Sequence, residues 1–229
     1  MSEQKYASIF DILGPEMIGP SSSHTAGAVR IGLAARSILN DKLLSVRIFF
    51  YNSFADTGAG HGTDKAILAG LMGYEKSDSR IKEAEKIAKD KGIKFSITRK
   101  GGANNYKPNT AVIKMKSPLW NIEVVGVSIG GGLIVIEQID GFEVNINCEY
   151  ETLIVTHRDK VGILAEILKE ISDRNLNIVS INSVRHNKVE DIKTVICFDN
   201  HIDAKIRDKL KKMNDILRVR IIHKIEERL

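Results

Sequence analysis

Cysteine is scarce in this chain, and long apolar runs are missing. The 229 residues include two cysteines, Cys148 and Cys197, which is too few for a disulfide framework. No run of about eighteen apolar residues occurs, so no membrane-spanning segment is expected. The N-terminus lacks the charged and then apolar pattern of a secretion signal. These absences predict a cytoplasmic protein.

Proline is also scarce, with four residues, and no low-complexity run argues for long disorder. Hydrophobic residues make up 43% and charged residues 28%, which is ordinary for a globular protein. The net charge is +5, with a pI of about 9.1. Most basic residues alternate with acidic ones, as in KEAEKIAKDKG, so the sequence does not predict a nucleic-acid partner.

The first part of the chain mixes helical and strand patterns. Helices are expected over residues 26–39, 63–72 and 80–91, and strands over 45–51, 93–98, 110–116, 121–129 and 133–138. Because the strands cluster late, an α+β layer is favoured over regular βαβ winding. The run GGGLIVIEQIDG lacks the spacing of a dinucleotide-binding loop, and no helix follows it.

The order of the expected helices and strands changes near residue 148. From Glu151 the expected order is strand, helix, strand, strand, helix, strand within about eighty residues, a ferredoxin-like βαββαβ plan. The sequence therefore predicts two domains, residues 1–146 and 147–229.

Residues 19–25 read GPSSSHT directly before an expected helix. Free N–H groups and the helix dipole make such a place suited to an anion, and a histidine there can hold or move a proton. The candidate residues are Ser21, Ser22, Ser23, His24 and Thr25. The alternative is simple helix capping, although a cap needs one hydroxyl rather than four.

A second loop, GAGHGTD at residues 58–64, repeats this arrangement. His61 stands between glycines that permit close approach of a ligand, and Thr63 or Asp64 can cap the following helix. The alternative is a strand-to-helix turn with an incidental histidine. Two such loops in one domain predict a site that binds a carboxylate and supplies a general base.

The remaining polar residues are less informative. The loop HRDKVG at residues 157–162 could bind the charged groups of a small ligand, or it could be a connection capped by Asp159. Both cysteines are interpreted as buried, and no metal-ligating set is predicted in this chain. Three further histidines, interpreted as structural or solvated, are His186, His201 and His223.

The chain resembles the beta subunits of iron–sulfur-dependent L-serine dehydratases. The resemblance rests on SIFDILGPEMIGPSSSHTAGAVRIG, GAGHGTDKAI, KPNTAVI and VVGVSIGGGLI, which span roughly residues 8–138. The second domain is similar to an ACT domain, a module that often senses amino acids. The resemblance implies an α+β chain: an α/β domain like the allosteric substrate-binding domain of some phosphoglycerate dehydrogenases, followed by the ACT domain.

The resemblance also implies an activity, the conversion of L-serine to pyruvate and ammonia. A separate alpha subunit would hold a 4Fe–4S cluster, and an iron of that cluster would take the β-hydroxyl of serine. His61 or His24 would remove the α-proton, and the choice between them is open. The residues implied to hold the substrate are Ser21, Ser22, Ser23, Thr25, Thr63 and Asp64.

For the ACT domain, the resemblance implies association with a second copy and an effector site. The implied effector residues are His157, Asp159, Val161 and Gly162. A rival hypothesis from another class is a serine-sensing regulatory protein that uses the same loops without chemistry. The second histidine loop favours the enzyme, because sensing a carboxylate needs no proton-transfer group.

Overall fold

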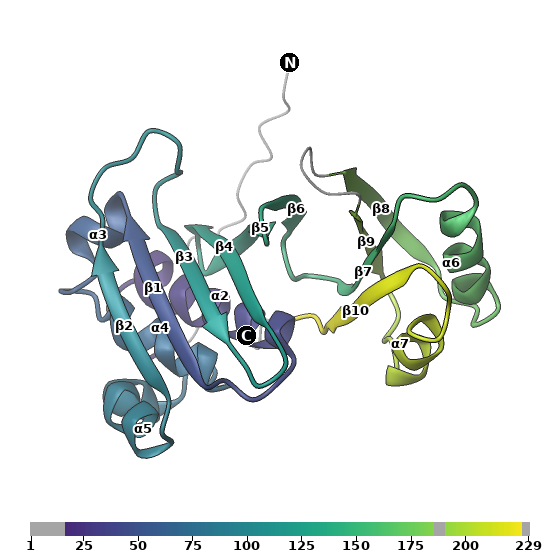
Figure 1. The fold of residues 1–229 in the computed structure, drawn as a ribbon. Coiled ribbons are helices and arrows are strands. Elements are labelled where there is room, and N and C mark those ends of the chain that lie inside the picture. The colour runs from purple at the N-terminus through teal and green to yellow at the C-terminus, as the bar shows by residue number, and fades with distance from the viewer. Residues whose placement is uncertain (1–16, 186–190, 226–229) are drawn as a thin grey trace.

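A computed structural model describes residues 17–185 and 191–225 of the chain (Figure 1). The described residues form two β-sheets, one of six strands in the order β2-β1-β3-β4-β5-β6 and one of four strands in the order β10-β7-β9-β8. The predicted α+β class, with a βαββαβ unit at the C-terminal end, is confirmed. None of the described helices is long and apolar enough to cross a membrane.

The first sheet belongs to the N-terminal domain. Its strands are β1 (Ser45–Tyr51), β2 (Lys94–Arg99), β3 (Thr110–Lys116), β4 (Asn121–Gly130), β5 (Leu133–Ile139) and β6 (Phe142–Ile146). Strand β1 pairs with β2 in parallel, and the other described pairs in this sheet are antiparallel. The helical elements are η1 (Ser22–Ala26), α2 (Gly27–Leu39), α3 (Ser53–Thr57), α4 (Thr63–Leu71), η2 (Ser79–Glu83) and α5 (Ala84–Asp90).

Strong local patterns were predicted well. Strands β1 and β3 have the predicted bounds: β1 is rich in β-branched and aromatic residues that alternate in burial, and β3 begins with four buried residues. The sequence also favours a glycine-rich loop over residues 54–64, and this prediction is wrong in part, since helix α3 extends over Ser53–Thr57. The side chain of Asn52 fixes the start of α3 by accepting from Ala103 N at 2.8 Å and donating to Tyr106 O at 2.6 Å. A five-residue helix held by such contacts is too short for helical periodicity to reveal.

Helices α2 and α4 pack so closely that their backbones are in contact at two glycines. A Cβ atom on Gly70 would lie 2.1 Å from Val29 O, and one on Gly32 would lie 2.4 Å from Ile67 O. Glycine is therefore required at both positions. This close crossing brings the start of α2 beside the start of α4, where the two predicted histidine loops lie.

The second sheet carries the C-terminal domain. Its elements are β7 (Glu151–Arg158), α6 (Ile163–Ser172), β8 (Ile178–Arg185), β9 (Asp191–Phe198), α7 (Ala204–Leu210) and β10 (Ile216–Ile222). Apolar residues of α6 and α7 form a core with one face of the sheet, as Ile167, Ile206 and Phe198 illustrate. Figure 1 shows both helices on the side of this sheet that faces away from the first domain.

The opposite face of the second sheet packs on the first domain. Ile154, Val195 and Ile222 belong to the same buried cluster as the α2 residues Ile31 and Ala34. Lys193, which is 2% exposed, donates from Nζ to the backbone oxygen of Ile139 at 3.0 Å. The two domains therefore share a continuous core.

Candidate functional site

The predicted segment before α2 forms a π-helical turn, η1. Ser21 caps it, because its Oγ accepts from the backbone N–H of His24 at 3.1 Å. The backbone N–H of Thr25 donates to Ser21 O at 2.8 Å. Single π-turns frequently mark functional sites, and here the wider turn places His24 toward helix α3.

His24 is surrounded by hydroxyl groups. Its Nδ1 lies 2.9 Å from Ser23 Oγ, and its Nε2 lies 3.0 Å from Ser53 Oγ and 2.9 Å from Thr57 Oγ1. Partial burial lowers the pKa of His24, and the nearby His61 lowers it further. His24 is thus held as a neutral ring in a fixed orientation. Ser53 and Thr57 were missed by sequence reasoning, because helix α3, which brings both hydroxyls to His24, was not predicted.

His61 makes a different set of contacts. Its Nδ1 lies 2.9 Å from the backbone oxygen of Thr57, and since a carbonyl only accepts, Nδ1 donates the hydrogen. In the neutral ring the lone pair then belongs to Nε2, which has no hydrogen-bond partner among the described residues. Thr25 Oγ1 donates to the backbone oxygen of His61 at 3.0 Å and joins the two loops. The two imidazole centroids lie 4.9 Å apart.

Thr63 and Asp64 begin α4 but do not cap it through their side chains. Thr63 is fully buried, and its Oγ1 has no partner in the described part of the chain. One oxygen of Asp64 pairs with Arg99 Nη2 at 2.5 Å, while the other is buried and unpartnered. The structure therefore brings both residues to the histidine loops and leaves oxygen atoms free for a ligand or water.

The segments KPNTAVI (107–113) and VVGVSIGGGLI (124–134) also lie beside the start of α2. A Cβ on Gly27 would lie 2.2 Å from Ser128 Oγ, so the end of β4 touches the start of α2. The backbone N–H of Ser128 donates to Asn109 O at 3.1 Å. Ser128 Oγ and Asn109 Oδ1 are buried without a described partner. These two side chains join the candidate site, and sequence reasoning had not assigned them a role.

The expected effector residues do not form one exposed loop. His157 lies within β7 and is fully buried, with Nδ1 2.9 Å from Arg158 O and Nε2 2.9 Å from Thr194 Oγ1. The predicted loop start is wrong, because pairing with β9 extends β7 through Arg158. Asp159 forms an ion pair with Arg185, and Val161 is fully exposed. Gly162, with φ of +90°, makes the left-handed turn into α6.

The cysteines of this chain do not fit an iron–sulfur cluster. Such clusters are usually held by four thiolates, and the chain has two cysteines. Cys148 is fully buried, and burial raises the pKa of its thiol to about 12, so the thiol stays protonated. Cys197, also expected to be buried, is only partly buried and packs against the same core between the domains. Both residues act as core side chains.

Of the histidines interpreted as structural or solvated, two gather on one carboxylate. His201 and His223 both lie beside Glu151, where β7 begins. His186 lies outside the described residues. The sequence carries little signal for this cluster, because Glu151 and His223 are 72 positions apart.

Two neighbouring imidazoles between two helix starts, joined to a βαββαβ unit, are features of a two-domain α+β protein with an ACT domain. Residues 152–215 match the ACT domain family, and residues 8–139 match the family described as serine dehydratase beta chain. The chain belongs to the serine dehydratase beta chain family. The resemblance inferred from the sequence is confirmed.

Three relatives show the extent of the similarity. The chain is 41% identical over 215 residues to the probable L-serine dehydratase beta chain of Bacillus subtilis, covering 94% of this chain and 97% of the relative. It is 36% identical over 205 residues to the L-serine dehydratase beta chain of Peptoniphilus asaccharolyticus, covering 89% and 90%. It is 33% identical over 164 residues to the L-serine dehydratase of Streptomyces coelicolor, covering 58% of this chain but 34% of that protein.

Proposed function

We propose that this chain is the beta subunit of an L-serine dehydratase, which converts L-serine to pyruvate and ammonia together with a separate alpha subunit. The observation that carries the proposal is the His24–His61 pair, in which one imidazole is locked by hydroxyls and the other keeps Nε2 free. Similarity to two beta chains over most of their length supports it.

The residues divide into substrate-holding and proton-moving groups. His61 is the general base, because its unpartnered Nε2 can accept the α-proton of serine. His24 positions the reacting groups through its hydroxyl contacts. The substrate carboxylate is bound at the π-turn by hydroxyl and backbone N–H groups. The residues assigned to substrate binding are Ser21, Ser22, Ser23, Thr25, Thr63 and Asp64.

Two observations support a partner subunit: the share of a longer relative that this chain matches, and the small number of cysteines in this chain. The L-serine dehydratase of Streptomyces coelicolor is matched over 34% of its length, so most of that protein is not matched by this chain. Because the thiols of Cys148 and Cys197 do not fit a cluster, the 4Fe–4S cluster belongs to the alpha subunit in this proposal. When bound there, it supplies Lewis-acid chemistry. The cytoplasmic location expected from the sequence is part of the same proposal.

In this proposal the ACT domain begins at residue 147, directly after the end of β6. It has two proposed roles, association with a second copy and binding of an effector. Strand β8 is an edge strand whose residues are largely exposed, with Val179 40% and Ile181 45% exposed, which suits pairing with a second copy. The loop at Asp159, Val161 and Gly162 is the proposed effector site, and buried His157 supports it from β7.

Anaerobic co-purification of this chain with its candidate alpha subunit tests the proposal. We expect an iron-loaded complex that releases pyruvate from L-serine, while neither chain does so alone. A chain that finds no partner and shows no turnover, yet binds serine, would refute the enzyme and leave the sensing protein.

A further inference from the structure

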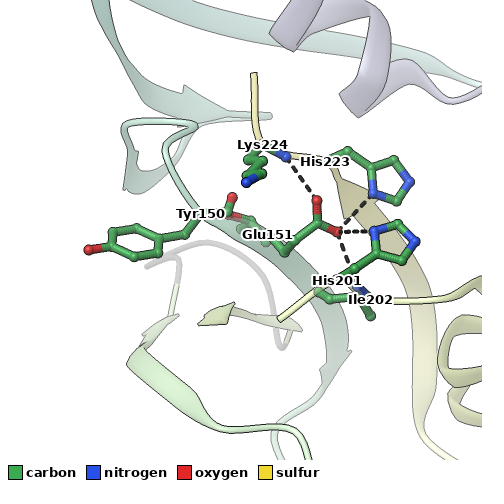
Figure 2. Close-up of polar contacts among 7 residues, drawn as sticks. Tyr150, Glu151, His201, Ile202, His223 and Lys224 are labelled. Atoms are coloured by element: carbon green, nitrogen blue, oxygen red, sulfur yellow. Dashed lines mark hydrogen bonds and ion pairs between the residues drawn. The ribbon is translucent and has the colours of Figure 1, made fainter. Parts of the chain in front are cut away.

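Three potential metal ligands meet at the edge of the C-terminal domain (Figure 2). Glu151 opens β7, His201 lies between β9 and α7, and His223 directly follows β10. His223 Nδ1 lies 2.8 Å and His201 Nδ1 3.4 Å from the same carboxylate oxygen, Oε2 of Glu151. The three ligand atoms all lie within 4.8 Å of one another. Figure 2 shows both imidazoles directed at this oxygen.

The carboxylate is fixed before any ion arrives. The backbone N–H of Ile202 donates to Oε2 of Glu151, and that of Lys224 donates to Oε1, each at 3.1 Å. Burial favours the protonated acid, but the contacts from His223 and the two amides outweigh it and lower the pKa of Glu151. Outer contacts of this kind orient carboxylate ligands in metal sites.

The imidazole side of the cluster is open. The side chains of His201 and His223 are 73% and 56% exposed, whereas that of Glu151 is 5% exposed. The two rings are stacked with centroids 5.2 Å apart. Both rings direct Nδ1 at the same carboxylate oxygen, and a neutral imidazole nitrogen is a common metal ligand.

We propose that Glu151, His201 and His223 bind a divalent transition-metal ion of the Zn²⁺ type. Two imidazoles and one carboxylate form the donor set of open zinc sites, which keep a fourth position for water. Ligands of tetrahedral zinc, with bonds of about 2.0–2.1 Å, lie about 3.3–3.4 Å apart. The three ligand atoms, all within 4.8 Å of one another on two exposed rings and one carboxylate, lie near this spacing. Hard cations such as Mg²⁺ prefer oxygen ligands and are excluded by the two imidazoles.

The site has a structural consequence for the link between the domains. Two residues after His223, the backbone N–H of Ile225 donates to Cys148 O at 2.9 Å. Arg30 on α2 contacts the backbone oxygen of Ile225 at 3.4 Å. An ion bound to Glu151 and His223 therefore joins the first and last strands of the ACT domain beside the segment that touches α2. We expect metal binding to raise the melting temperature of the whole chain.

The experiment is a titration of the metal-free full-length chain with ZnCl₂ by calorimetry near neutral pH, with Co²⁺ as an optical probe. We expect one Zn²⁺ per chain and the visible absorption of Co²⁺ with nitrogen and oxygen ligands. H201Q and H223Q should each weaken Zn²⁺ binding by more than roughly tenfold, the lower bound for loss of an outer-shell partner. Because His201 is so exposed, H201Q is expected to fold as the parent does, which its melting curve without metal checks.

The matched control is H61N, which removes a histidine from the other imidazole pair, His24 and His61. Zn²⁺ affinity and the Co²⁺ spectrum should be unchanged in H61N. The proposal is overturned if H201Q and H223Q bind Zn²⁺ like the parent, if only H61N loses binding, or if the parent binds no ion. In the last case the cluster is a set of polar contacts between two imidazoles and one carboxylate only.

Discussion

His24 and His61 lie 4.9 Å apart between ring centroids, with their planes tilted by 37°. Thr57 contacts both rings, with its hydroxyl 2.9 Å from Nε2 of His24 and its backbone oxygen 2.9 Å from Nδ1 of His61. One residue of α3 thus orients two imidazoles differently. It engages the Nε2 of His24 and leaves the Nε2 of His61 available for proton transfer.

Replacing His61 by asparagine tests the assignment of the base. In the assembled enzyme, H61N should lower kcat by about a hundred- to ten-thousandfold, the usual contribution of general base catalysis. Pyruvate release from L-serine measures this. K205A, which changes a lysine that is 88% exposed on α7, serves as the control and should keep parental turnover. Near-normal kcat in H61N would remove His61 from the mechanism.

The same substitution should change the titration of His24. Burial is the larger cause of its lowered pKa, and His61 is the second. In H61N the pKa of His24 should therefore rise, yet remain below its ordinary value of 6.5. Imidazole NMR across a pH series measures the shift. An unchanged His24 titration would show that the rings do not interact electrostatically.

His24 also predicts how stability depends on pH. Its pKa is lower in the folded than in the unfolded chain, so the unfolded chain binds more protons as pH falls below 6.5. The free energy of unfolding should decrease as pH falls through that range. H24Q should show a weaker decrease in urea unfolding experiments. Equal pH slopes for H24Q and the parent would contradict this origin of the effect.

Gly70 should tolerate no side chain. In G70A the new methyl would lie 2.1 Å from the Val29 carbonyl oxygen, so α2 and α4 must separate. We expect a loss of about 1–3 kcal/mol in the free energy of unfolding, measured by urea denaturation. G60A is the control, because the nearest atom to its methyl, Thr57 O, is 3.7 Å away. Similar unfolding midpoints for the two variants would contradict the close crossing.

Lys193 is a buried cation whose titration should make the stability of the protein depend on pH in the alkaline range. Burial lowers the pKa of Lys193 from 10.5 to about 8. Between these values the unfolded chain binds the extra proton, so the parent gains stability as pH rises from 8 toward 10.5. K193M lacks this titration, so its stability relative to the parent should fall as pH rises from 8 toward 10.5, by on the order of 1 kcal/mol or more.

Urea unfolding of K193M at neutral and alkaline pH measures this difference. The control is K205M on α7, where the lysine side chain is 88% exposed, and it should follow the parent at every pH. A stability difference for K193M that does not change with pH would exclude the buried charge as its cause.

The β8 edge should mediate association of the ACT domain. Ile181 is 45% exposed on this strand, and a charge there opposes pairing of two edges. I181E should convert the associated chain to a monomer in analytical ultracentrifugation. L119E is the control, because Leu119 is 70% exposed between β3 and β4, away from this edge. A parental mass in I181E would assign association to another surface.

The sequence by itself determined the features that depend on local side-chain periodicity. β-Branched and aromatic composition placed β1 correctly, β3 was also placed correctly, and the βαββαβ order followed from the succession of strand and helix patterns. The segments around His24 and His61 were also recognisable, because serine, histidine and glycine before a helix carry their chemistry in the chain order. Such signals extend over a few residues and need no partner from elsewhere.

Only the tertiary structure decided which distant residues meet. Helix α3 was invisible because contacts of Asn52 with a separate loop define it, and it is α3 that distinguishes His61 from His24. Burial of His157 follows from the pairing of β7 with β9. Glu151 and His223 meet because β7 and β10 are neighbours in the second sheet. Strand pairing joins residues across long sequence separations, and side-chain period alone does not specify which strands pair.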